Sequence, residues 1–183
     1  MACQSDLLNG GISLGCEPNA GGVKKIYITD AVSVTGITQN AGGILVASGE
    51  VINNIAMATS TFFYNFEFNR NTSSYVESAT VNLENGTTFY TQTITLVIPR
   101  REQTKRNKIL LLAAGQKKLN IIVQDSNDLY WFFGQSEGCI LTGNEGGSGT
   151  AKTDLNGYTL TFTAEEPTLA PEVDATVIPS IVQ

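Results

Sequence analysis

Short segments in which hydrophobic and polar residues alternate run through most of the chain, and they predict β-strands. These segments are rich in β-branched residues and are separated by Gly, Asn or Asp. The segments outside the centre of the chain are 23–29, 32–39, 43–48, 119–124, 129–133 and 157–163. Two of these segments, 119–124 and 129–133, flank the turn sequence Asp125-Ser-Asn-Asp128 and are expected to form a hairpin.

The segment 61–69 (TFFYNFEFN) carries the most aromatic residues. Alternation places Phe62, Tyr64, Phe66 and Phe68 on one face of a strand, with polar residues on the other face. We expect these side chains to form part of the core rather than a platform for a ligand.

A long hairpin is expected from residues 76–84 and 87–98, which flank Asn85-Gly86. This dipeptide suits the positive φ angles of a type I′ turn. Strands of that length exceed the five or six residues usual in small domains. The hairpin is therefore the best candidate for a projecting element that forms an assembly.

One helix is expected at about 101–114, after Pro99 has ended the preceding strand. Glu102 and Arg106 are spaced to form an i, i+4 ion pair, and Gly115 is placed to end the helix. The single helix and the absence of alternating strands and helices exclude a doubly wound parallel sheet. The pattern predicts a mainly β fold, a β-sandwich or flattened barrel with one flanking α-helix.

Three segments lack a periodic pattern. Residues 1–22 are expected to form an extended N-terminal arm, and residues 167–183, with three prolines, an extended C-terminal tail outside a single domain at 23–166. Gly138 to Gly149 reads as a flexible loop. Its run Gly146-Gly147-Ser148-Gly149 lacks the Walker-type spacing and a following helix, so it does not predict phosphate binding.

Composition narrows the possible chemistry. The chain has no histidine, which removes the commonest general base and metal ligand. The neighbouring carboxylates Asp125/Asp128 and Glu165/Glu166 suit turns, and no other pattern indicates a catalytic, cofactor-binding or metal site. We therefore predict that the protein is not an enzyme. Only 15% of residues are charged, and Thr, Asn and Gly are abundant, which predicts a neutral polar surface.

The cysteines, the N-terminal residues and the apolar segments indicate the compartment of synthesis and whether the chain spans a membrane. Cys3, Cys16 and Cys139 have no CxxC spacing, so free thiols are favoured, with a Cys3–Cys16 pair as the alternative. The N-terminal residues do not resemble a secretory signal, and the run Ile109–Ala114 is far shorter than the roughly 20 residues that span a bilayer. We expect synthesis in the cytoplasm and no membrane-spanning segment.

Charge is strongly segregated. The segment from 100 to 118 carries +6 and the rest of the chain carries −12. Three interpretations remain open: a subunit interface, a solvated face, or contact with phosphates. The candidate interface comprises this basic group and the turn of the long hairpin: Arg100, Arg101, Lys105, Arg106, Lys108, Lys117, Lys118, Asn85 and Gly86.

The order of these elements resembles a known family. The Thr-rich hairpin around Asn85-Gly86, the helix ending in LLLAAG, the hairpin LNIIVQDSNDLYWFFG and the strand GYTLTFTAEEP are similar to tail proteins of tailed bacteriophages. The similarity covers about residues 60–166 and is greatest to small tail-tube or tail-ring proteins of phages of gut Bacteroides-type bacteria, including the crAss-like group.

This resemblance implies a virion structural protein. Its partners would be identical subunits in a ring, neighbouring tail or portal proteins, and genomic DNA that passes through the lumen without sequence-specific binding. The resemblance is compatible with two places in the virion: a ring of the tail tube, or a ring of a short tail near the portal. The alternative from another class is a carbohydrate-binding or adhesin β-sandwich module of a bacterial surface protein.

Overall fold

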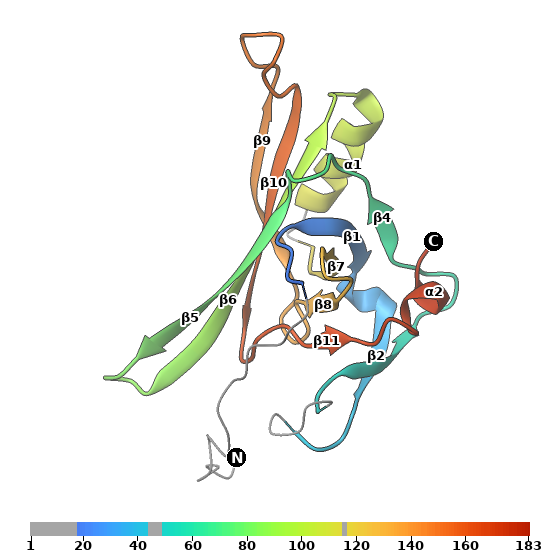
Figure 1. Ribbon diagram of the computed structural model, residues 1–183, viewed down its shortest axis with the longest axis vertical. Coiled ribbons are helices and arrows are strands. Elements are labelled where there is room, and N and C mark those ends of the chain that lie inside the picture. The colour runs from blue at the N-terminus through green and yellow to red at the C-terminus, as the bar shows by residue number, and fades with distance from the viewer. Residues whose placement is uncertain (1–17, 44–48, 115–116) are drawn as a thin grey trace.

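The computed structural model describes residues 18–43, 49–114 and 117–183, and it shows a mainly β protein. Two sheets pack face to face, one of seven strands in the order β2-β3-β11-β8-β7-β1-β4 and one of four in the order β5-β6-β10-β9. One helix, α1 (Gln103–Ala113), flanks them (Figure 1). The predicted β-sandwich with one flanking helix is confirmed.

The seven-stranded sheet consists of β1 (Val23–Asp30), β2 (Val34–Gln39), β3 (Ile52–Met57), β4 (Tyr64–Phe66), β7 (Leu119–Asp125), β8 (Tyr130–Phe133) and β11 (Glu172–Val173). The four-stranded sheet consists of β5 (Ser74–Asn82), β6 (Thr87–Pro99), β9 (Ile140–Gly147) and β10 (Gly157–Glu166). Two short helical segments complete the described fold: η1 (Ala31–Ser33) and α2 (Ile178–Ile181). Strands pair antiparallel throughout these residues except where β11 lies parallel to β3.

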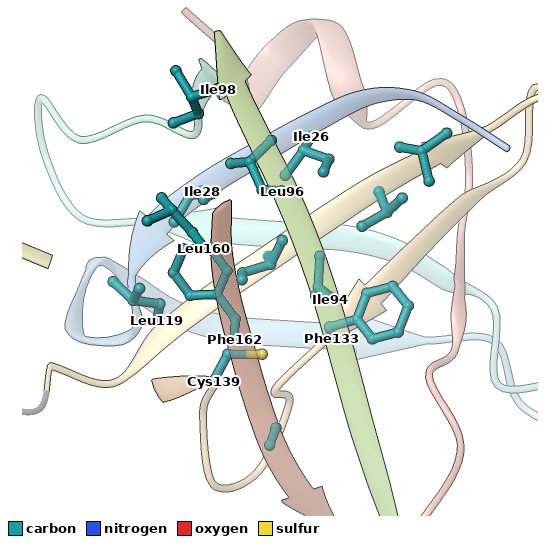
Figure 2. Packing of buried hydrophobic residues seen from close by; sticks show 14 of the residues in the cluster. Ile26, Ile28, Ile94, Leu96, Ile98, Leu119, Phe133, Cys139, Leu160 and Phe162 are labelled. Atoms are coloured by element: carbon teal, nitrogen blue, oxygen red, sulfur yellow. The ribbon is translucent and has the colours of Figure 1, made fainter. Parts of the chain in front are cut away.

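The main core lies between the two sheets. Alternate residues of β6 and β10 face inward, and they meet the inward residues of β1 and β7. Figure 2 shows Leu96 and Leu160 facing Ile26 and Ile28, with the strands of the two sheets crossing steeply. This crossing corresponds to the orthogonal class of sheet packing. From α1, Ile109 is buried in the same core, which closes one end of the sandwich.

The seven-stranded sheet is covered on both faces at β7, where every residue is buried. On the face away from the main core, Tyr27 and Ile122 pack in a second cluster with residues from the C-terminal segment. The predicted extended tail at 167–183 is therefore wrong. This segment contributes β11, α2 and the buried residues Ala170, Val173, Val177, Ile178 and Ile181.

The aromatic segment 61–69 also differs from its prediction. Only Tyr64–Phe66 form a strand, which pairs with β1, and Tyr64 is exposed. Phe63, the residue out of phase with the predicted face, is fully buried in the second cluster and packs edge-on against Phe132. The main-chain N–H of Phe63 donates to the Ile181 carbonyl, so the segment turns toward the C-terminal cover instead of continuing as a strand.

The predicted flexible loop 138–149 is wrong, because most of it forms β9. Glycines allow the close pairing of β9 with β10. A Cβ at Gly146 would lie 2.9 Å from ring atoms of Tyr158, and one at Gly143 would lie 3.2 Å from the Thr161 Cβ. The glycines of β9 therefore leave room for the larger side chains of β10.

Gly157, at the start of β10, provides a stability prediction. A Cβ there would overlap the Ile98 carbonyl oxygen and lie 3.1 Å from the Pro99 Cα, and backbone cannot move aside cheaply. We expect Gly157→Ala to lower the free energy of unfolding by about 1–3 kcal/mol, measured by urea denaturation. The control is Gly147→Ala, because Gly147 pairs with Gly157 across the strands and has open space at its Cβ. Equal effects of the two substitutions would contradict this prediction.

Other expectations are confirmed or untested. The helix predicted at 101–114 is confirmed as α1, and the hairpin predicted from 119–124 and 129–133 as β7 and β8. The predicted strand 43–48 lies outside the described residues except for Gly43. The first seventeen residues of the predicted N-terminal arm also lie outside them, including Cys3 and Cys16.

Candidate assembly interface

The hairpin of β5 and β6 extends beyond the rest of its sheet. The register of β10 on β6 ends at the pair Glu166–Tyr90, whereas β5 and β6 stay paired as far as Asn82–Thr87. Side chains from Ser78 to Thr88 are exposed on both faces. Figure 1 shows this end of the hairpin projecting away from the sandwich. The predicted long, projecting hairpin is confirmed.

The turn of the hairpin differs from the predicted type I′ turn. Because Asn82 pairs with Thr87, four residues form the loop, and of these only Gly86 has a positive φ, at 64°. The Asn82 Oδ1 accepts hydrogen bonds from the main-chain N–H groups of Glu84 and Asn85 at 3.0 and 3.2 Å. Asn85 and Gly86 thus lie at the tip, as expected, within a longer loop that leaves Leu83 91% exposed.

The four-stranded sheet has two open edges. In the part of the chain that the structure describes, β5 and β9 each pair with one neighbour only. Neither strand contains Lys, Arg or Pro, the residues that commonly protect an edge from further pairing. Only the bulge opposite Thr161 and Phe162 interrupts β9. These edges are suited to pairing with another chain.

The outer face of the same sheet is lined with threonine. Because alternate residues of β6 and β10 point into the core, six threonines point outward: Thr91, Thr93, Thr95, Thr159, Thr161 and Thr163. Thr93 lies opposite Thr163 and Thr95 opposite Thr161, and the Thr142 and Thr163 hydroxyls are 2.9 Å apart. Neither β6 nor β10 contains a Lys or Arg. The result is a hydroxyl-bearing face without Lys or Arg on β6 and β10, with Glu165 on β10 near one end and Glu145 on β9 opposite Thr159.

The basic group does not form one surface. Lys105 donates to the main-chain carbonyls of Pro99 and Arg100 at 2.7 and 3.2 Å, which ties α1 to the end of β6. Lys117 pairs with Asp30 and Lys118 with Glu137, each at 3.2 Å. These lysines stabilise the subunit itself, although surface pairs contribute little each.

The arginines near α1 are also divided. The Arg100 Nε lies 2.9 Å from Glu102, so the expected Glu102–Arg106 pair is wrong. The Arg101 guanidinium lies over the Tyr158 ring at 5.3 Å. Within the described residues, no ion pair involves Arg106 or Lys108, and both are exposed on α1. These two residues are the part of the basic group that remains available to a partner.

The carboxylates that could suggest catalysis have structural roles. Glu166 is 2% exposed and accepts hydrogen bonds from the main-chain N–H groups of Ser136 and Glu137 at 2.9 to 3.1 Å, whereas Glu165 is exposed. Asp125 accepts from Asn127 N–H and Leu129 N–H at 2.8 and 3.0 Å, which fixes the predicted turn.

A buried polar contact fastens the base of the hairpin, and sequence reasoning did not predict it. Glu77 on β5 accepts a 2.7 Å hydrogen bond from Ala170 N–H, and its burial raises the pKa of its carboxyl. On β6, Gln92 accepts from Gly134 N–H at 3.1 Å. The hairpin is thereby held to the C-terminal segment and to the loop after β8.

The described residues contain no group of three or more His, Cys, Asp or Glu side chains that could hold a metal ion. Cys139 is a buried free thiol, and burial raises its pKa far above the usual range. No described helix combines the length and the apolar character needed to cross a membrane.

The two open edges, the projecting hairpin and the exposed part of α1 are therefore the surfaces to which a function can be assigned. Comparison of the chain with protein-family models, with curated proteins and with solved structures finds no match.

Proposed function

We propose that the protein is a structural subunit of a bacteriophage tail, where identical copies form a ring around the path of the DNA. The observation that carries this proposal is the four-stranded sheet, whose edge strands β5 and β9 each have a single neighbour among the described residues. In the ring, β9 of one copy pairs with β5 of the next. A ring of this kind uses two different patches of each subunit, as cyclic assemblies require.

Strand direction supports such a joint. All pairs within the sheet are antiparallel, and the sheet has an even number of strands, so β5 and β9 run in opposite directions. A copy related by rotation about an axis along the strands therefore presents its β5 antiparallel to the β9 of its neighbour. Every joint continues the antiparallel alternation, and the closed barrel has no edge.

The threonine face suits a passage for DNA. With the sandwich core on one side of the sheet, the Thr-bearing side lines the inside of the barrel. Lys and Arg on that surface would bind phosphates in a salt-dependent way and hold the DNA. Neither β6 nor β10 supplies such a residue, so DNA can slide. The function is to contact neighbouring subunits and to let DNA pass, in a virion tail assembled in the bacterial host.

Paired proline substitutions test the joint. Successive residues of a strand direct their main-chain N–H groups to opposite edges. Of the variants Ser78→Pro and Ala79→Pro on β5, one therefore removes a hydrogen bond to β6, and the other removes an N–H donor that points away from β6. We expect wild-type protein to form rings in electron micrographs and light scattering. The variant that better keeps the wild-type melting temperature is expected to reduce ring formation at least tenfold.

The control is Val32→Lys, a change in η1 outside the four-stranded sheet, at a residue that is 88% exposed. It should leave rings intact. A wild-type protein that stays monomeric at all concentrations, or that binds glycans as a monomer, would overturn the proposal.

A further inference from the structure

Two Asn-Gly pairs of the described residues lie in opposite surroundings. Asn85-Gly86 is at the exposed tip of the hairpin of β5 and β6, and Asn156-Gly157 is at the entry to β10. Figure 1 shows these two places at opposite ends of the four-stranded sheet. A third pair, Asn9-Gly10, lies outside the described residues. Asn is thermally labile, and before Gly it is especially so, because no Cβ shields the main-chain nitrogen that follows it.

The reaction open to such a pair is deamidation, which needs only water. The glycine nitrogen gives up its proton to solvent and attacks the side-chain carbonyl carbon of the asparagine. The new N–Cγ bond forms while the Cγ–Nδ2 bond breaks, and the nitrogen that leaves takes up a proton and departs as ammonia. Water then opens the resulting five-membered succinimide at either carbonyl, which gives aspartate or isoaspartate without oxidation or reduction.

The hairpin tip leaves both reacting groups free. The Asn82 Oδ1 accepts from the Glu84 and Asn85 N–H groups, but among the described residues no hydrogen bond involves the Gly86 N–H or the Asn85 side chain. Gly86 has a φ of 64°, and a Cβ placed there would meet no atom within 4 Å. The Asn85 side chain can therefore reach the Gly86 nitrogen without displacing packed atoms.

The second pair is held by main chain. The Asn156 carbonyl accepts a 2.6 Å hydrogen bond from Arg100 N–H, and Gly157 pairs with Pro99 on β6. Gly157 is buried, and a Cβ there would overlap the Ile98 carbonyl oxygen. For the Gly157 nitrogen to attack, the peptide between Asn156 and Gly157 must rotate. The hydrogen bond and the close packing oppose that rotation.

We propose that Asn85 is a site of spontaneous deamidation in the folded protein, whereas Asn156 is protected by the sheet. Each copy exchanges a neutral amide for a carboxylate beside Glu84, so the tip gains a second negative charge as the protein ages. Where isoaspartate forms, the main chain of the tip is also one methylene longer. Because the side chains from Ser78 to Thr88 are exposed, the change alters the projecting surface without removing a core contact. This inference does not depend on the proposed ring.

Peptide mapping by mass spectrometry tests the proposal on the full chain, kept folded in mildly alkaline buffer. Asn9→Gln removes the third pair from the measurement. We expect the peptide that contains Asn85 to gain the one mass unit of deamidation at least tenfold faster than the peptide that contains Asn156. The matched variant is Asn85→Gln, which keeps the amide but would have to close a less favourable six-membered ring. The acidic band that the wild type develops in isoelectric focusing should be absent from this variant.

Unfolding separates the effect of the structure from that of the sequence. In urea both pairs lose their surroundings, so the rate at Asn156 should rise to approach the rate at Asn85. Equal rates at the two residues in the folded protein, or an Asn85 that reacts only after unfolding, would overturn the proposed site. An Asn156 that stays slow in urea would overturn its protection by the sheet.

Discussion

A chain shortened to end at Glu166 is expected to lose its cooperative thermal unfolding transition. Besides Ala170, the removed segment supplies four larger buried aliphatic residues: Val173, Val177, Ile178 and Ile181. Burial of such a side chain contributes roughly 1.5–3 kcal/mol, and a whole domain is stable by about 5–15 kcal/mol. The segment also supplies β11, which links β3 to β8, so without it β2 and β3 lose their connection to the sheet.

Point substitutions in the same segment give a graded test. Ile181→Ala is expected to lower the free energy of unfolding by about 2–5 kcal/mol, because Ile181 is only 3% exposed. Leu169→Ala is the matched control, since Leu169 is 53% exposed and its loss is expected to cost under about 0.5 kcal/mol. Near-ultraviolet circular dichroism and thermal scans measure both. A shortened chain that melts like the full one would show that the C-terminal segment is dispensable.

Glu166→Gln is expected to lower the free energy of unfolding by about 2–4 kcal/mol. The buried carboxylate accepts from Ser136 N–H and Glu137 N–H, and an amide turns one acceptor oxygen into a donor that faces these donors. Glu166 is the last residue of β10 and holds the loop after β8 through these bonds, so the substitution should also loosen that loop. Urea denaturation measures the loss.

The neighbouring residue supplies the control. Glu165 lies next to Glu166 on the same strand but is exposed on the outer face, so Glu165→Gln makes the same chemical change outside the core. We expect this variant to stay within about 0.5 kcal/mol of the wild type. Equal losses from the two substitutions would mean that the bonds to the loop do not stabilise the fold.

Alternation along the sequence predicted the strands whose two faces differ. β6 and β10 have one face in the core and one lined with threonine, so their residues alternate clearly. In the segment 61–69 the predicted face is correct for Phe66 and Phe68, which pack against the main core, and wrong for Tyr64, which is exposed. The burial of Phe63 could not be predicted from alternation, because it depends on the second cluster, whose other members come from distant parts of the chain.

Two predictions were wrong because they used the local composition of a segment without the residues that pack against it. Glycines suggested a loop at β9, yet they are required by Tyr158 and Thr161 on the strand beside it. Prolines suggested an extended C-terminal tail, yet Pro179 lies in the first turn of α2 and the Pro171 carbonyl accepts from Phe132 N–H. In both segments, contacts with residues far away in the sequence determine the structure more strongly than the local glycines and prolines do.

The candidate interface was predictable in part. The sequence located the hairpin and its tip, because turn residues lie between two alternating segments. It also located the basic group as a set of charges. Which of those charges are used within the subunit depends on the fold, since Lys117 meets Asp30 and Lys118 meets Glu137 only once the sheets have formed.

The shape of the hairpin has a consequence for the speed of association. Its tip is ordered by strand pairing and by the hydrogen bonds to the Asn82 side chain, and the β-branched Thr and Val side chains of the flanking strand ends have few rotamers to lose. The conformational entropy of the tip is therefore lost when the chain folds and not when a partner arrives. Rigid surfaces of this kind dock with little rearrangement, so encounter and orientation, rather than a change of shape, set the rate.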